Sequence, residues 1–157
     1  MDHLDVNSGT GSIKNIAIAS DHAGYALKAE ITGFLQEQGF SVLDLGTDGP
    51  ASVDYPDFAE ALVKALADQR AGRGILICGT GIGISIAANR HRHIRAAHCH
   101  DTTDARLSRQ HNDANVIALG ARTLGPEVAR DCVAVFLETA FEGDSNPRHG
   151  RRIDKMS

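Results

Sequence analysis

The most prominent candidate for chemistry in this sequence is a glycine-rich run, CGTGIGIS, at residues 78–85. Gly79, Gly81 and Gly83 alternate with larger residues, so the backbone N–H groups around them are left uncovered. The run follows an apolar strand candidate and precedes a helix candidate, whose N-terminal end carries partial positive charge. Such a loop favours an anion, either a phosphate or an oxyanion that develops during a reaction, and Ser85 could add a hydroxyl donor.

Two other interpretations of the glycine run stay open. The glycines could serve only to make a tight turn between a strand and a helix. A dinucleotide could also bind, because Asp101 follows downstream, but position 84 is Ile where a third glycine is typical. The run also follows the third predicted strand rather than the first, and the chain has no GxxxxGKS/T phosphate loop.

Cys78 stands at the end of the predicted strand and faces the glycine run. A thiol beside a helix N-terminus ionises more readily and can act as a thiolate base. The alternative is a buried packing residue, which is the commoner fate of a lone cysteine. Cys99 and Cys132 have no such setting and are expected to pack in the core.

Asp21 and His22 end the first predicted strand, and His111 precedes the last one. A carboxylate accepts hydrogen bonds from sugar hydroxyls, whereas an imidazole can donate to phosphate or move a proton near neutral pH. Asp21 could instead be an ordinary helix cap, and His111 a surface or capping residue.

A compact cationic cluster, RHGRR at residues 148–152, lies near the end of a chain whose formal net charge is −4. The guanidinium fork matches phosphate oxygens, so these arginines are candidates for a phosphate site. They could also form a solvated tail. Because the cluster is short and lacks aromatic residues, it supports nucleic-acid binding poorly, and no nucleic-acid partner is expected.

Histidines occur in two pairs with the spacing of metal ligands, His91 with His93 and His98 with His100. Neither pair has a matching set of acidic or cysteine partners, so no metal site is expected there. Nothing in the sequence assigns a function to this histidine-rich segment.

The elements that must position these residues alternate regularly along the chain. Helical periodicity recurs between short apolar runs, which predicts a parallel sheet covered on both sides by helices. Right-handed crossovers allow the second and third strands to flank the first, so a ligand is expected beyond the ends of strands 1 and 3. The predicted strands are 16–19, 41–45, 74–78, 94–99 and 115–119; the predicted helices are 26–38, 57–67, 84–90, 102–110 and 126–137; a final turn or helix could follow in 146–157.

Composition limits the class of protein. The chain has 157 residues, of which 42% are hydrophobic, and this suits one globular domain, expected at 14–157 behind a flexible polar leader at 1–13. No stretch approaches the length of a membrane span, so no membrane association is expected. Three scattered cysteines do not form a disulfide framework, which favours a reducing cytoplasm.

Five blocks of the sequence, taken together and in order, resemble a known family. They are SDHAGYALK at 20–28, DYP at 54–56, GILICGTGIGISIAANR at 74–90, RLSRQHNDANVIALGAR at 106–122 and RHGRRID at 148–154. The chain resembles the type B ribose-5-phosphate isomerases, a group that includes galactose-6-phosphate isomerase subunits, over about residues 14–154. The resemblance implies a Rossmann-like three-layer α/β/α sandwich with a five-stranded parallel sheet, catalysis without metal or other cofactor, and active sites between subunits of a homodimer or dimer of dimers.

The resemblance also implies roles for individual residues. Cys78 corresponds to the base that moves a proton between C1 and C2 of the sugar, while Thr80 and His111 correspond to residues that assist ring opening. Some family members use a glutamate of the glycine loop instead of the cysteine; this chain keeps the cysteine. The residues that correspond to substrate-binding positions are Asp21, Tyr55 and Asn112 at the sugar, Gly79, Gly81, Gly83 and Ser85 in an anion hole, and His22, Arg122, Arg148 and Arg152 at the phosphate.

These roles combine into an expected reaction, the interconversion of ribose 5-phosphate and ribulose 5-phosphate through an enediolate. Loop amides stabilise the oxyanion, and the arginines anchor the phosphate, which orients the reacting end. Two alternatives stay open: an isomerase of another phosphorylated aldose, such as a hexose or tetrose phosphate, and a non-catalytic sugar-phosphate-binding module. Pure binding would need no proton-transfer groups, so Cys78, Thr80 and His111 together argue against the module.

Overall fold

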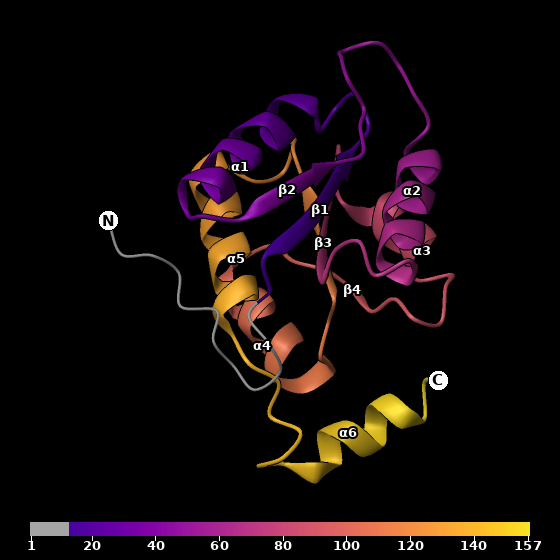
Figure 1. Ribbon diagram of the computed structural model, residues 1–157, viewed down its shortest axis with the longest axis vertical. Helices are drawn as coiled ribbons and strands as arrows, with labels where there is room; N and C mark the ends of the chain where they lie inside the picture. Colours follow the sequence, from indigo (N-terminus) through magenta and orange to yellow (C-terminus); the bar gives the residue numbers. More distant parts are fainter. Residues whose placement is uncertain (1–12) are drawn as a thin grey trace.

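The computed structural model describes residues 13–157 and contains one five-stranded parallel sheet with helices on both faces (Figure 1). The predicted α/β/α arrangement is thereby confirmed. The strands are β1 (Asn15–Ser20), β2 (Ser41–Asp44), β3 (Arg73–Cys78), β4 (Ala96–His98) and β5 (Val116–Gly120). The helices are α1 (Tyr25–Glu37), α2 (Tyr55–Ala67), α3 (Ile82–Ala88), α4 (Thr102–Asn112), α5 (Pro126–Glu138) and α6 (Pro147–Asp154).

The strand order is β2-β1-β3-β5-β4, and every neighbouring pair is parallel. β1 lies between β2 and β3, as the crossover argument predicts, so the chain reverses its winding direction beyond the ends of β1 and β3. All residues of β3 and β5 are buried, because helices cover both faces of the central strands. These carboxyl ends of the strands form the upper edge of the sheet in Figure 1.

Alternating side chains of the central strands enter two separate cores, one on each face of the sheet. One core receives Ile16, Ile75 and Ile117 together with α1, α4 and α5, on the left of the sheet in Figure 1. The other receives Leu76 and Cys78, with α2 and α3 on the right. The Cys78 side chain therefore projects toward the α2–α3 layer.

The structure differs from the sequence prediction mainly at β4, which has three residues rather than six. The side-chain amide of Asn89 donates to the Ala96 carbonyl at 2.9 Å and accepts from the Ala96 N–H at 2.8 Å. On the other side Arg95 N–H donates to Asn115 Oδ1 at 2.8 Å, so side chains replace strand pairing just before β4. Helices α1, α2 and α3 begin one or two residues earlier than predicted.

The C-terminal end of the chain lies outside the layers of the sheet and its helices (Figure 1). The basic tail forms helix α6, which packs against α4 and lies at the lower end of the molecule (Figure 1). Of the predicted leader, residues 1–12 lie outside the described residues, and Ile13 packs against the core. In residues 13–157, no helix combines the length and the apolar character needed to cross a membrane.

Candidate active site

The glycine loop, residues 79–81, joins β3 to α3 and wraps around the thiol of Cys78. Gly81 N–H donates to Cys78 Sγ at 3.1 Å, and Cys78 is only 4% exposed. Gly81 has φ of +80°, a left-handed conformation that a side chain would strain, so glycine is required where the loop turns into the helix. Thr80 Oγ1 accepts the N–H of Ile82 at 3.2 Å. The loop thus places a thiol and a hydroxyl within one turn of chain, each joined to a backbone amide.

The Ser85 hydroxyl is used differently from the sequence expectation. Ser85 is 8% exposed, and its Oγ donates to the carbonyl oxygen of Ile82 at 2.8 Å, within the first turn of α3. In this conformation Ser85 stabilises the helix start that carries the loop amides, and its proton is not directed at a ligand.

Asp21 and His22 lie at the end of β1, beside β3. Asp21 N–H donates to the Ile77 carbonyl at 3.2 Å, and Asp21 Oδ1 accepts Gly24 N–H at 3.2 Å, so the carboxylate supports the turn that starts α1. His22 Nδ1 accepts the N–H of Val53 at 3.2 Å. When the ring is neutral, the proton is therefore on Nε2, where it can be donated to a ligand.

Tyr55 and Arg122 close the loop from two sides. Tyr55 begins α2 and packs over Gly83, where an added Cβ would lie 2.5 Å from Tyr55 Cζ. Arg122 N–H donates to the Gly79 carbonyl at 2.8 Å, and an added Cβ on Gly79 would lie 3.2 Å from Arg122 Nη1. One chain gathers ten of the predicted site residues at the carboxyl edge of the sheet, and we call them the loop group. They are Asp21, His22, Tyr55, Cys78, Gly79, Thr80, Gly81, Gly83, Ser85 and Arg122.

The remaining predicted site residues lie at the opposite end of the molecule, where α4 ends and α6 packs against it (Figure 1). They are called the tail group and comprise His111, Asn112, Arg148 and Arg152. Because α4 runs back from the carboxyl edge of the sheet, its last residues precede β5 at the amino edge. One chain therefore does not bring His111 or the α6 arginines next to Cys78.

His149, which the sequence analysis did not assign a role, organises the tail group. Its ring stacks on that of His111 with centroids 4.3 Å apart and planes 17° apart. Burial lowers the pKa of His149 below its usual value, and the neighbouring His111, Arg148 and Arg152 lower it further. The ligand atoms of His111, Glu142 and His149 lie within 4.8 Å of one another. However, a metal ion lies in the plane of each imidazole that binds it, so the two nearly parallel rings would have to turn before sharing one ion.

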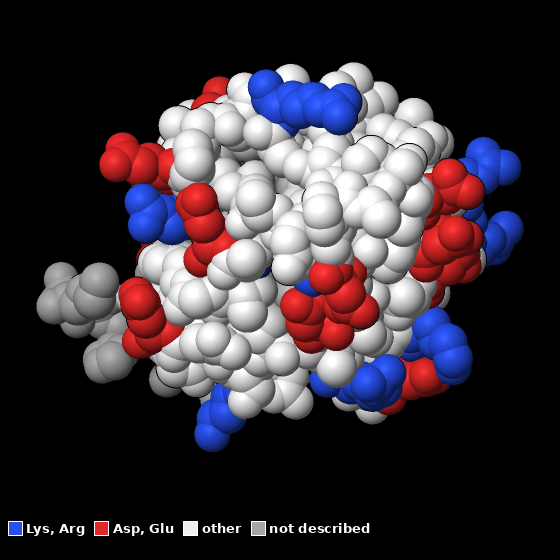
Figure 2. Space-filling view, turned by 90° about the horizontal axis from the view of Figure 1, so that it is seen from above, with Lys and Arg blue, Asp and Glu red and all other residues white. Residues whose placement is uncertain are grey.

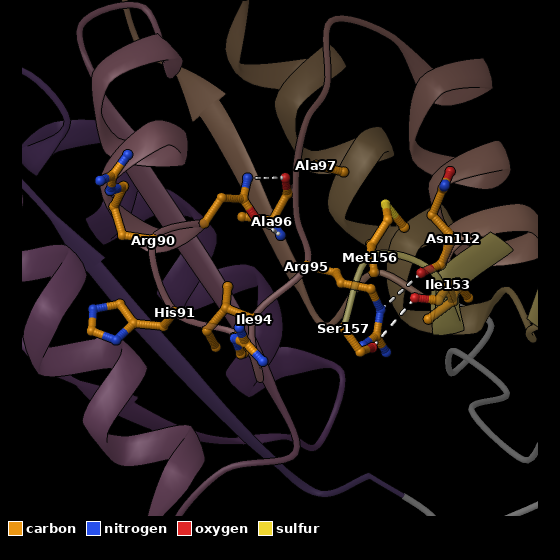
Figure 3. A pocket seen from close by; sticks show the side chains of 13 residues that line it. Arg90, His91, Ile94, Arg95, Ala96, Ala97, Asn112, Ile153, Met156 and Ser157 are labelled. Atoms are coloured by element: carbon orange, nitrogen blue, oxygen red, sulfur yellow. Dashed lines mark hydrogen bonds between the residues drawn. The ribbon is translucent and has the colours of Figure 1, made fainter.

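A cavity of about 520 Å³ adjoins the tail group rather than the loop group. It lies between the start of β4 and the end of α6, and its lining includes Arg90, Arg95, Asn112 and Ile153 (Figure 3). Arg95 Nε donates to the Asn112 carbonyl at 3.0 Å, which ties β4 to the end of α4. No residue of the loop group lines this cavity.

The carboxyl edge of the sheet carries few cationic side chains near its centre (Figure 2). Figure 2 views the molecule from above Figure 1 and shows a largely uncharged surface, with acidic side chains near its centre and Lys and Arg mainly toward the margin. Within the loop group Arg122 is the one arginine, whereas the tail group holds two. The cationic side chains of the candidate site are thus divided between the loop group and the tail group.

Lys28 and Asp44 form an ion pair near the loop that the sequence pattern did not reveal. Lys28, 3% exposed, donates to both carboxylate oxygens of Asp44 at 2.6 and 2.8 Å, and Asp44 Oδ1 also accepts Gly46 N–H at 2.9 Å. This pair anchors the start of the loop that leads to Tyr55. Burial raises the pKa of Cys99 to about 12 and that of Cys132 to about 11, in agreement with the packing role predicted for them.

Comparison with known proteins identifies the family. The model of the ribose/galactose isomerase family matches residues 16–156. Ribose-5-phosphate isomerase B of Escherichia coli is 45% identical over 145 residues, which cover 92% of this chain and 95% of that protein. D-erythrulose-4-phosphate isomerase of Pectobacterium atrosepticum is 48% identical over 82% of this chain and 86% of that protein. The structure of Clostridium thermocellum ribose-5-phosphate isomerase B superposes with a TM-score of 0.87 at 50% identity, covering 90% of this chain and 94% of that one. The chain belongs to the ribose/galactose isomerase family.

Proposed function

We propose that this protein interconverts ribose 5-phosphate and ribulose 5-phosphate. The observation that carries the proposal is the Cys78 thiol, which is held by Gly81 N–H at 3.1 Å on a glycine-rich loop, in a chain of an isomerase family. Moving a proton between adjacent carbons needs a base next to a group that stabilises negative charge. The loop supplies both within one turn of chain.

The reaction has four requirements, which are ring opening, proton transfer, stabilisation of the enediolate and binding of the phosphate, and each is assigned to named groups. His111 protonates the ring oxygen while the Thr80 hydroxyl assists at the other end of the breaking bond, and the sugar ring opens. Cys78, as thiolate, takes the proton from C2 of the aldose and returns it to C1, while the proton of the C2 hydroxyl moves to the oxygen on C1. Between these steps the loop amides stabilise the enediolate, and loss of one such donor costs about 3 kcal/mol. The phosphate is held by His22 and Arg122 together with Arg148 and Arg152.

This assignment requires two copies of the chain, because the loop group and the tail group lie at opposite ends of one copy. In a homodimer, or a dimer of dimers, the tail group of one copy completes the loop group of the other. An exposed apolar surface beside the loop supports such a contact: Ile82 and Ile86, one turn apart on α3, are 52% and 59% exposed. The free thiols Cys78, Cys99 and Cys132 fit a reducing cytoplasm.

The test uses NMR to monitor exchange of the C2 proton of ribose 5-phosphate in D₂O. Wild-type protein is expected to exchange the proton and form ribulose 5-phosphate. Cys78→Ala is expected to abolish exchange while binding of the sugar phosphate persists. Cys132→Ala is the matched control, because it removes a thiol from the core and is expected to leave turnover near normal. Near-normal turnover in Cys78→Ala would remove the thiol from its role, and binding without any exchange in the wild type would indicate a binding module.

A tetrose phosphate is the second candidate substrate. The observation that favours it is the 48% identity to the Pectobacterium D-erythrulose-4-phosphate isomerase. The two candidates share the chemistry at C1 and C2 and differ in the distance from these carbons to the phosphate. A panel of tetrose, pentose and hexose phosphates, compared by kcat/KM, distinguishes them: a preference for a tetrose or hexose phosphate by tenfold or more would replace ribose 5-phosphate as the substrate.

A further inference from the structure

His98 contacts the glycine loop, although the proposed reaction assigns it no role. It ends β4, and β5 lies between β4 and β3 in the sheet, so its side chain reaches the loop across the end of β5. His98 Nε2 lies 2.7 Å from the carbonyl oxygen of Thr80. Gly120, at the end of β5, makes this approach possible, since an added Cβ there would lie 2.5 Å from the same oxygen.

The Thr80 carbonyl and the Gly81 N–H belong to one planar peptide unit. His98 binds the oxygen of this peptide unit, and the N–H of the same unit donates to Cys78 Sγ at 3.1 Å. The imidazole also lies against the Gly81 backbone, because an added Cβ on Gly81 would be 2.8 Å from His98 Cδ2. A single rigid unit therefore joins the His98 ring to the Cys78 thiol.

The chemistry of this hydrogen bond determines what His98 does. A carbonyl oxygen only accepts, so Nε2 must carry the proton, in the neutral ring as well as in the cation. Donation to the carbonyl polarises the peptide and makes its N–H a stronger donor toward sulfur. The His100 ring lies beside the His98 ring, with centroids 4.3 Å apart, and the backbone N–H of His100 donates to Asp104 Oδ2 at 3.1 Å.

We propose that His98 is a positioning residue that orients the Thr80–Gly81 peptide and, through it, the Cys78 thiol. The inference rests on the proposed function, in which Cys78 is the base. His98 acts through this peptide: it sets the direction of the amide that holds the thiol.

Three variants test this role. His98→Leu removes the donor and is expected to lower kcat about 5- to 10-fold, the worth of one hydrogen bond, with KM within twofold of wild type. His98→Gln carries an N–H group at a similar distance from the backbone and is expected to recover most of kcat. His93→Leu is the matched control: it removes a histidine that bonds to the Val63 carbonyl at 3.1 Å, outside the loop, and is expected to leave kcat unchanged.

An NMR readout that is independent of activity accompanies the kinetics. The Gly81 amide resonance is expected to shift in His98→Leu and to return toward its wild-type position in His98→Gln. An unmoved Gly81 amide with wild-type kcat in His98→Leu, or equal losses in the Leu and Gln variants, would overturn the positioning role. If the wild type isomerises no phosphorylated sugar, the proposed function fails, whereas the Gly81 resonance still decides whether His98 orients this peptide.

Discussion

Two inactive variants of this protein should regain activity when their subunits are mixed. Cys78→Ala damages the loop group and His111→Ala damages the tail group, and these groups lie at opposite ends of one chain. If each active site combines the loop group of one copy with the tail group of another, a mixed dimer carries both damaged groups in one site and neither in the other. One intact site per mixed dimer should therefore appear.

The size of the recovery follows from counting sites. Random pairing of equal amounts of the two variants gives mixed dimers as about half of all dimers, and each has one intact site of two. The mixture should thus show about a quarter of wild-type kcat per chain, with a wild-type KM, because the intact sites are unaltered. The assay is ribose 5-phosphate isomerisation by the unfractionated mixture of co-expressed variants, in which two different affinity tags measure the fraction of mixed dimers.

A second mixture provides the control. Cys78→Ala and Thr80→Ala both damage the loop group, so every site of their mixed dimers has a damaged loop and no recovery is expected. Recovery in this control would show that subunits are not combined as proposed. Absence of recovery in the Cys78→Ala and His111→Ala mixture, with mixed dimers demonstrated by the tags, would refute sites shared between copies.

Two further predictions concern stability. Lys28→Met should lower the free energy of unfolding, measured in urea, by about 2 kcal/mol. This is less than the loss expected for a fully buried ion pair, because the Asp44 side chain is 44% exposed. A change below about 0.5 kcal/mol would contradict the prediction. The pKa of His149 is lowered in the folded state, so the unfolded chain binds more protons there, and stability should fall as pH drops below about 6.5. The His149→Phe variant should lose part of this slope in Tm measured from pH 5 to 8, and an unchanged slope would show that His149 does not contribute.

The central sheet could be predicted because the local pattern of apolar residues marks its strands and the helices beside them. The continuously apolar run that became β3 and the helical periods on either side indicate a strand covered on both faces. Right-handed crossovers then place β1 between β2 and β3, which leads to the turns at Asp21 and Cys78 as the place to search for a site. The loop group therefore follows from local pattern and one rule of topology.

The parts that escaped prediction depend on contacts between distant segments. Strand lengths and spacings do not reveal that β5 lies between β3 and β4, so the contact from His98 to Thr80 could not be inferred. The six-residue prediction for β4 is too long at its start, where the Arg95 N–H donates to the Asn115 side chain instead of to a strand carbonyl. Similarly, the sequence pattern does not reveal that His111 and Cys78 lie at opposite edges of the sheet in one chain (Figure 1).

The Asn89 carboxamide has a consequence for self-association. β4 is an edge strand, and edge strands can recruit another chain through their unpaired N–H and C=O groups. Asn89 already occupies both outward groups of Ala96, at 2.8 and 2.9 Å. The start of this edge is therefore capped, and another strand could pair with Ala96 only after displacing the Asn89 carboxamide.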